Sequence, residues 1–206
     1  RLDTGVELGV PVEASVDARG EGEQIKVRAA MRADARGSVQ LVATLDELSS
    51  ERPAWDFSLI TNELEAHEIV RGVEIPPHQL NLWASASGNG LEPDTLDARL
   101  RLGVESSRFG DYFIQGAYLE ASARDGLVEV QTFAVDTPYL RAVATGSFNQ
   151  KDGAFSLEAQ AHSEDELAKI TGGKLAENAR LEAQIDATGR LDLDAEDPLG
   201  IVASSK

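Results

Sequence analysis

The stretch that decides the fold is residues 181–195, LEAQIDATGRLDLDA, where apolar or small residues take every odd position and polar residues every even one. A strand places successive side chains on opposite faces of a sheet, whereas a helix would spread them around its circumference. The stretch therefore predicts one long amphipathic strand, or two strands joined near Gly189.

The same alternation recurs along most of the chain. It covers residues 10–18, 25–33, 80–86, 96–104, 117–123, 140–148 and 155–161. Glycine, Asn and Asp tolerate the left-handed backbone of tight turns, and they stand between these stretches, as in Asp125-Gly126 and Asp152-Gly153. Short connections favour antiparallel pairing. We therefore expect a mainly β protein of at least nine long amphipathic strands in an antiparallel meander.

Two short stretches carry helix signals. In residues 163–170, Ser163 precedes Glu166 by three positions, the spacing of a capping box, and Leu167 and Ile170 would point inward. In residues 62–70, Asn62 is placed to cap a helix with a weak apolar stripe. We expect one or two short helices and no more.

Composition excludes several function classes. The 206 residues include 36 acidic and 19 basic side chains, giving a net charge of -17, which repels nucleic acid and disfavours an anionic membrane surface. Cysteine is absent, so disulfides, thiolate metal sites and cysteine nucleophiles are excluded. No apolar run approaches the roughly 20 residues that a membrane-spanning helix needs.

The chain begins at Arg1 without a methionine and ends on Ser204-Ser205-Lys206. These ends favour a part excised from a longer protein, with any anchor or targeting segment outside it. Aromatic residues make up only 5% of the chain and methionine occurs once, so large core-filling side chains are scarce. Small residues on an apolar face predict either closely packed sheets or an unfilled space.

A loose internal repeat is present. Phe57-Ser58-Leu59 and Phe155-Ser156-Leu157 each precede a helix-like stretch, and each is followed by an alternating strand that ends in glycine, Gly88 or Gly189. The order recurs after about 100 residues, a longer period than that of common solenoids. We interpret residues 1–206 as one continuous segment with the repeat in 55–105 and 153–200.

With these features the chain resembles the AsmA-like/TamB family of the Gram-negative envelope. The stretches that carry the resemblance are 56–59 (DFSL), 84–90 (ASASGNG), 96–100 (LDARL), 114–117 (IQGA), 126–130 (GLVEV), 139–146 (YLRAVATG) and 155–159 (FSLEA). These are rhythmic signatures of alternating strands rather than catalytic motifs.

The resemblance implies a curled β-groove, an open gutter or half-barrel that is polar outside and apolar inside. It implies a non-enzymatic segment of a periplasmic protein anchored in the inner membrane, which shields phospholipid acyl chains during transport between the two membranes. A TamA-like outer-membrane partner is implied as well, as is an alternative role as a chaperone-like assembly factor that pairs with strands of nascent outer-membrane proteins and autotransporters.

The expected lipid-facing lining follows from the apolar register of the strands. It comprises Leu80, Leu82, Ala84, Ala86, Leu96, Ala98, Leu100, Leu102, Leu119, Leu140, Ala142, Ala144, Phe155, Leu157, Ala159, Leu181, Ala183, Ile185, Leu191 and Leu193. The free energy gained by burying a methylene group does not depend on its direction, so we expect all residues of the apolar register to share the binding of lipid. We expect no catalytic residue, no cofactor and no metal site.

Two other interpretations stay open at this point. The same alternation would build an ordinary β-sandwich or closed barrel, whose small residues let the sheets approach closely. A carbohydrate-active β-domain is disfavoured, because no pair of carboxylates flanked by aromatic platforms is evident.

Isolated polar motifs favour structural roles. His67, His78 and His162 lack ligand-spaced partners and are expected on the surface or in loops. The acids of residues 192–197 lack the glycine of a calcium loop and are expected on a solvated face. Residues 88–91 favour a turn over a nucleotide loop, because no helix follows. Trp83 lies on the polar register of its strand, which favours a seam or edge cover over a contact patch.

Overall fold

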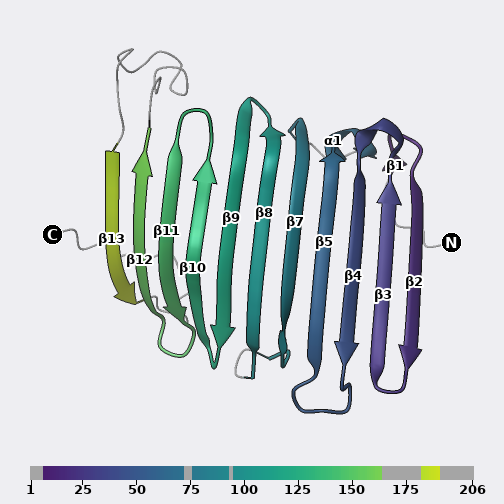
Figure 1. Ribbon diagram of the computed structural model, residues 1–206, viewed down its shortest axis with the longest axis horizontal. Helices are drawn as coiled ribbons and strands as arrows, with labels where there is room; N and C mark the ends of the chain where they lie inside the picture. Colours follow the sequence, from purple (N-terminus) through teal and green to yellow (C-terminus); the bar gives the residue numbers. More distant parts are fainter. Residues whose placement is uncertain (1–6, 72–75, 93–94, 164–181, 191–206) are drawn as a thin grey trace.

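The computed structural model describes residues 7–71, 76–92, 95–163 and 182–190. Eleven strands of this part form one antiparallel sheet, which Figure 1 shows as a single layer with the strands side by side. Its order from edge to edge is β13 (Glu182–Arg190), β12 (Ala154–His162), β11 (Arg141–Asn149), β10 (Leu127–Asp136), β9 (Tyr112–Arg124), β8 (Asp97–Phe109), β7 (His78–Asn89), β5 (Ala54–Leu64), β4 (Ser38–Asp46), β3 (Gln24–Arg32) and β2 (Glu13–Glu21).

The remaining elements lie at one end of this sheet. A 3-10 helix, η1 (Asp34–Arg36), connects β3 to β4. After β5 the chain makes one helical turn, α1 (Ala66–Ile69), and continues into β6 (Val70–Arg71). β6 pairs with β1 (Glu7–Leu8) in a separate two-stranded sheet.

The predicted fold class is confirmed: strands make up 73% of the described residues, and the large sheet does not close into a barrel. The extensive contacts between strands all join neighbours within a sheet. Among the described residues only Ala33, Ile69 and Ala84 are buried apolar side chains. This part of the chain is therefore a single layer and not two sheets packed around a core.

Two of the helix and strand predictions need correction. The helix expected at residues 62–70 is a single turn, because Asn62 continues β5 opposite Ser38 instead of capping a helix. The cross-strand hydrogen bonds of β5 override the weak helical stripe. The strand expected from residue 10 begins only at Glu13. The helix expected at 163–170 lies, apart from Ser163, outside the described residues.

β-Bulges keep the apolar residues on one side of the sheet. In β10 one extra residue between Val130 and Phe133 interrupts the pairing with β11. A period of two would place Phe133 on the polar face, and the bulge returns it to the face of Val130. A similar extra residue lies in β5 between Thr61 and Leu64, where Glu63 has a φ of 48°.

The two halves of the internal repeat share an order of elements but not a register. In the first half Gly88 of β7 lies opposite Trp55 of β5, two residues before Phe57. In the second half Gly189 of β13 lies opposite Phe155 itself. Both halves of the repeat therefore keep the alternation and the glycine. The position of the glycine relative to the phenylalanine on the partner strand differs by two residues, so the glycine stays on the same face of the sheet.

Tight turns with left-handed residues connect several strands. The β9–β10 hairpin turns at Asp125 and Gly126, whose φ values are 52° and 82°. Positive φ at both central positions defines the type I′ turn, whose twist matches that of paired strands. The sequence Asp-Gly therefore sets the register of β9 against β10.

We predict that Gly126→Ala lowers the free energy of unfolding by about 1 kcal/mol, because a side chain is strained at a φ of 82°. Gly116→Ala is the matched control, since Gly116 lies within β9 and an added Cβ would meet no atom closer than 3.9 Å. Its cost should stay within about 0.5 kcal/mol. Urea unfolding measures both variants, and equal losses would contradict the role of the turn.

Candidate apolar groove

Residues that lie directly opposite each other in an antiparallel sheet project from the same face. Following the register from β2 to β13 gives apolar rows that cross all eleven strands. One row is Val16, Ala29, Leu41, Leu59, Ala84, Leu102, Leu119, Phe133, Ala144, Ala159 and Ile185. The next is Ala18, Val27, Ala43, Phe57, Ala86, Leu100, Ala121, Val130, Gly146, Leu157 and Ala187. We call the surface made by these rows and their apolar neighbours the apolar face.

Most of the predicted lining lies on this face. The register places there Leu82, Ala84, Ala86, Ala98, Leu100, Leu102, Leu119, Ala142, Ala144, Phe155, Leu157, Ala159, Ala183 and Ile185. Leu80 lies opposite Leu64, beyond the β5 bulge. Leu96 and Leu140 precede β8 and β11 and belong to connections rather than strands. Leu181, Leu191 and Leu193 lie outside the described residues.

Sequence reasoning missed two parts of the apolar face. The first is its extension over β2 to β5: the alternation of β2 and β3 was recognised but not included in the lining, and that of β4 and most of β5 was not recognised. The second is β10, where Val128, Val130, Phe133 and Val135 line up only because of the bulge. The signal in the sequence of β10 is a break in the alternation. Val128 and Val130 are two residues apart, Phe133 follows Val130 after three residues, and Val135 follows Phe133 after two.

The apolar face is open to its surroundings in the described part of the chain. Val16 on the edge strand β2 is 73% exposed and Ile185 on the opposite edge is 53% exposed. In the sheet interior Phe133 is still 40% exposed and Leu157 42% exposed. Side chains of this kind in a folded core are normally almost fully buried. No described element covers them.

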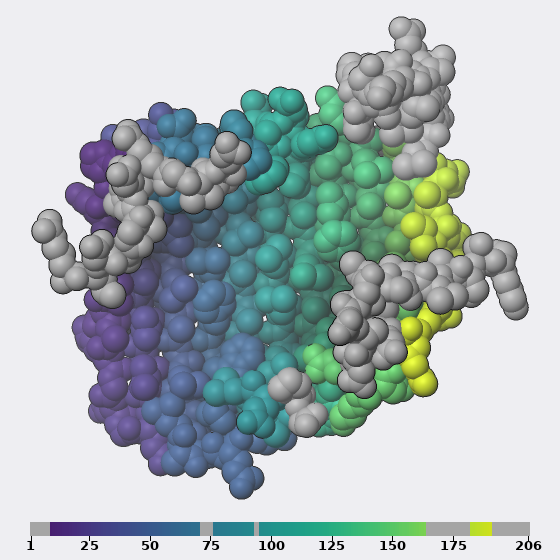
Figure 2. All heavy atoms as spheres, turned by 180° about the vertical axis from the view of Figure 1, so that it is seen from behind, coloured from purple at the N-terminus to yellow at the C-terminus, as the bar shows by residue number. Residues whose placement is uncertain are grey.

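A hollow of about 320 Å³ lies on this face. Small residues of β11, Ala144 and Gly146, form its floor, and larger side chains of the flanking strands, including Leu119, Phe133 and Leu157, form its walls. Figure 2 shows the sheet from behind, with its middle strands set back between the flanks. The hollow is thus lined by both small and bulky side chains of β11, since Phe148 also borders it.

The opposite face carries the charges. Arg101 of β8 donates to Glu120 of β9 at 3.0 Å, and the Tyr118 hydroxyl donates to the same carboxylate at 3.0 Å. The hydrogen bond from Arg101, followed by that from Tyr118, lowers the pKa of Glu120 from its ordinary value of 4.5. Desolvation, with the bond to Glu120 second, raises the pKa of Tyr118. Further exposed ion pairs join Arg124 to Asp97 and Arg141 to Asp136.

Trp83 lies on this charged face, as its register predicts. Its indole covers Gly103 of β8, because a Cβ on Gly103 would come within 2.4 Å of the ring. The ring centroid lies 6.2 Å from that of Tyr118 on β9. The two aromatic rings thus cover backbone that Gly103, which has no side chain, would leave exposed in the strand. This is the kind of seam that the sequence pattern favours for Trp83.

The prediction for the histidines is wrong for His78, which is only 5% exposed at the start of β7. The chain reversal through α1 brings the His67 and His78 rings to a centroid distance of 5.0 Å. Within the described residues, no group of three or more His, Cys, Asp or Glu side chains is placed to hold a metal ion. No helix in the same part of the chain is long and apolar enough to cross a membrane.

Comparison of the chain with family models, curated proteins and solved structures finds no match.

We predict that Leu157→Ala lowers the free energy of unfolding by about 1 kcal/mol or less, because Leu157 is already 42% exposed. Leu100→Ala on the same row should behave similarly. Ala144→Leu, which adds bulk to the open hollow, should leave stability within about 0.5 kcal/mol. Urea unfolding measures all three. Losses of about 3 kcal/mol in the leucine variants would mean that a further layer covers the face.

We also predict a pH-dependent effect of Glu120→Gln. Since the folded pKa of Glu120 lies below the ordinary 4.5, its contribution is present above that pH and is lost as pH falls through the folded value. The variant should unfold at lower urea than the parent at pH 7, and the gap should narrow progressively as pH falls below 4.5. Glu129→Gln, at an exposed position of β10, is the control. A gap of unchanged size below pH 4.5 would contradict the prediction.

Proposed function

We propose that the chain is a non-enzymatic conduit segment whose apolar face shields the acyl chains of phospholipids from water. The observation that carries the proposal is the unbroken apolar face across eleven strands, on which Phe133 is 40% exposed and Leu157 42% exposed. A soluble protein rarely leaves so large an apolar surface unless something binds to it. The charged opposite face, within a chain of net charge -17, supports solubility of the unliganded sheet.

The energetics suit a lipid that moves. Each methylene transferred from water to an apolar surface contributes roughly 0.8 kcal/mol, so two acyl chains gain on the order of 10 kcal/mol. Neighbouring strands are about 4.8 Å apart, so the face extends for about 48 Å from edge to edge. Every row consists of similar side chains, mainly Ala, Val and Leu. An acyl chain that shifts by one strand therefore loses one set of contacts and gains an equivalent set.

The resemblance to AsmA-like/TamB proteins supports the cellular setting that we propose. The segment would belong to a periplasmic protein of a Gram-negative bacterium, anchored in the inner membrane outside the residues described. Phospholipid would pass between inner and outer membranes. A TamA-like outer-membrane protein is the partner that this setting suggests.

A second candidate function is chaperone-like strand pairing with nascent outer-membrane proteins. It is favoured by the two edge strands, β2 and β13, whose outer backbone groups pair with no other described strand. Every residue of β2 is exposed. An open edge can accept an additional strand through main-chain hydrogen bonds.

Photocrosslinking separates the two functions. A benzophenone amino acid is placed at Leu157 or Ala144 on the apolar face, and at their neighbours Glu158 or Thr145 on the opposite face. The protein is then incubated with vesicles of phosphatidylethanolamine and phosphatidylglycerol, irradiated, and analysed by intact mass. We expect phospholipid adducts at the first two positions, at least about fivefold above the matched controls, because consecutive residues of a strand face opposite sides.

Equal adducts on both faces, or none on the apolar face, would contradict the conduit. In parallel, an outer-membrane strand peptide is added to protein that carries the crosslinker at Ser15 of β2 or Gln184 of β13. Peptide adducts at these edges without lipid adducts would favour the assembly role.

A further inference from the structure

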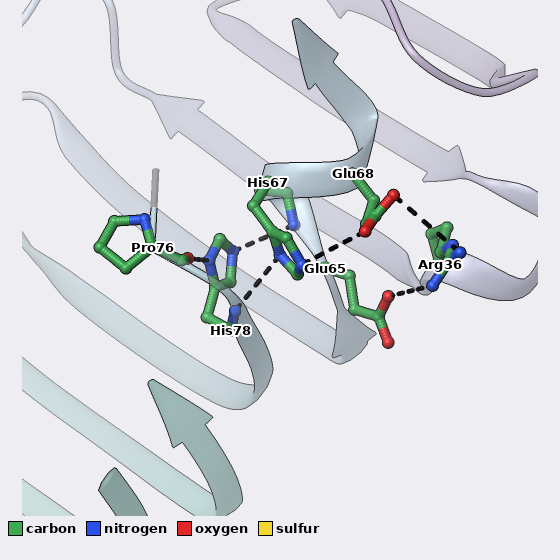
Figure 3. A network of polar contacts seen from close by, with 7 residues as sticks. Arg36, Glu65, His67, Glu68, Pro76 and His78 are labelled. Atoms are coloured by element: carbon green, nitrogen blue, oxygen red, sulfur yellow. Dashed lines mark hydrogen bonds and ion pairs between the residues drawn. The ribbon is translucent and has the colours of Figure 1, made fainter. Parts of the chain in front are cut away.

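A buried histidine fixes the corner where β5 turns through α1 into β6 and where β7 begins (Figure 3). Nε2 of His78 accepts a hydrogen bond from the backbone N–H of Ala66 at 3.0 Å, and Nδ1 lies 2.8 Å from the Pro76 carbonyl. A backbone amide only donates and a carbonyl only accepts. The ring is therefore neutral, with its proton on Nδ1, and no other protonation state satisfies both partners.

His67 of α1 depends on the neutral form in the same way. Its Nδ1 accepts from the backbone N–H of His78 at 3.2 Å, so the two histidines bind each other's backbone region. Its Nε2 lies 3.7 Å from a carboxylate oxygen of Glu68. On the other side of the pair, the His78 ring stacks on Phe109 of β8 with 6.0 Å between centroids.

These contacts hold a clip made of β1, α1 and β6. The backbone N–H of Gly9 donates to the Ile69 carbonyl at 2.8 Å, and β1 pairs only with β6 among the described strands. The clip is joined to the main sheet through α1. Its attachments there include the two histidines and the η1 residue Arg36, whose side chain lies 2.7 Å from Glu65 and 4.0 Å from Glu68. The Arg36 carbonyl also accepts from the Glu65 N–H at 2.9 Å, and Ile69 of α1 is buried.

Protonation opposes the histidine attachments. A proton on His78 Nε2 would face the Ala66 N–H, and a proton on His67 Nδ1 would face the His78 N–H, so each acceptor becomes a second donor. Two imidazolium rings at this separation also repel each other. Among the charged groups that face the pair, a carboxylate oxygen of Glu68 lies within ion-pair distance of His67 Nε2, at 3.7 Å, and would attract a protonated His67. Glu65 and Glu68 also contact Arg36, at 2.7 Å and 4.0 Å.

We propose that His67 and His78 form a pH-sensitive latch, which holds the clip on the sheet at neutral pH and releases it in mildly acidic conditions. Because both hydrogen bonds require neutral imidazole, the latch is closed while the two rings are neutral and opens when they take up protons in acid. This inference does not depend on the lipid-binding proposal, since it uses only the clip and its attachments.

Hydrogen exchange on the intact chain at pH 7.5 and pH 5.5, corrected for the intrinsic pH dependence of exchange, tests the latch. The reporters are the amides of Ala66 and His78, whose hydrogen bonds join the clip to β7, and the internal control is the β8–β9 pair. In the parent, the protection factors of the reporters should fall about tenfold or more at pH 5.5, while those of β8 and β9 stay within twofold.

Variants separate the latch from general destabilisation. His78→Gln keeps an uncharged acceptor near the position of Nε2 and should retain protection of the Ala66 amide at both pH values. His78→Ala should lose that protection at both. His162→Gln, at an exposed position of β12, should behave like the parent. The latch is overturned if the reporters of the parent are equally protected at both pH values, or if His78→Gln opens in acid as the parent does.

Discussion

The cross-strand register is the constraint on which the rest of this structure depends. Within the described residues no second layer covers the sheet, so the positions of side chains are set by backbone pairing between neighbouring strands and not by packing around a core. A shift of one residue in any pair would turn the apolar side chains of that strand to the charged face. The apolar face across eleven strands exists only because every register agrees.

Local devices maintain that agreement. The Asp125-Gly126 turn fixes one hairpin through its left-handed backbone, and the bulge in β10 corrects a change of phase within a strand. Cross-strand pairs such as Arg101 with Glu120 add charge complementarity on the opposite face. Each contribution is small, since exposed ion pairs are weak. Together they specify which residues pair across the strands of a sheet that buries little apolar surface.

The same single layer explains why chemistry is distributed rather than concentrated. Apolar side chains that would fill a core elsewhere remain half-exposed, and the hollow above β11 is lined by Ala144, Gly146 and Phe148 of that strand rather than by a specialised site. Of the buried polar side chains in the described residues, His78 lies at the corner near α1, where the chain leaves the sheet. There the His78 side chain binds the Ala66 N–H and the Pro76 carbonyl, two backbone groups that lie outside the strands.

The sequence by itself determined the mainly β class, the antiparallel order and most of the apolar lining, because a period of two assigns faces wherever the strand is regular. It could not place Phe133 or shorten the helix expected at residues 62–70, since a bulge and a continued strand depend on the partner strand. Only the tertiary structure decided that the sheet stays open in its described part and that His67 and His78 meet. The first depends on how all the strands are arranged and the second on the chain reversal through α1, and alternation within one segment encodes neither.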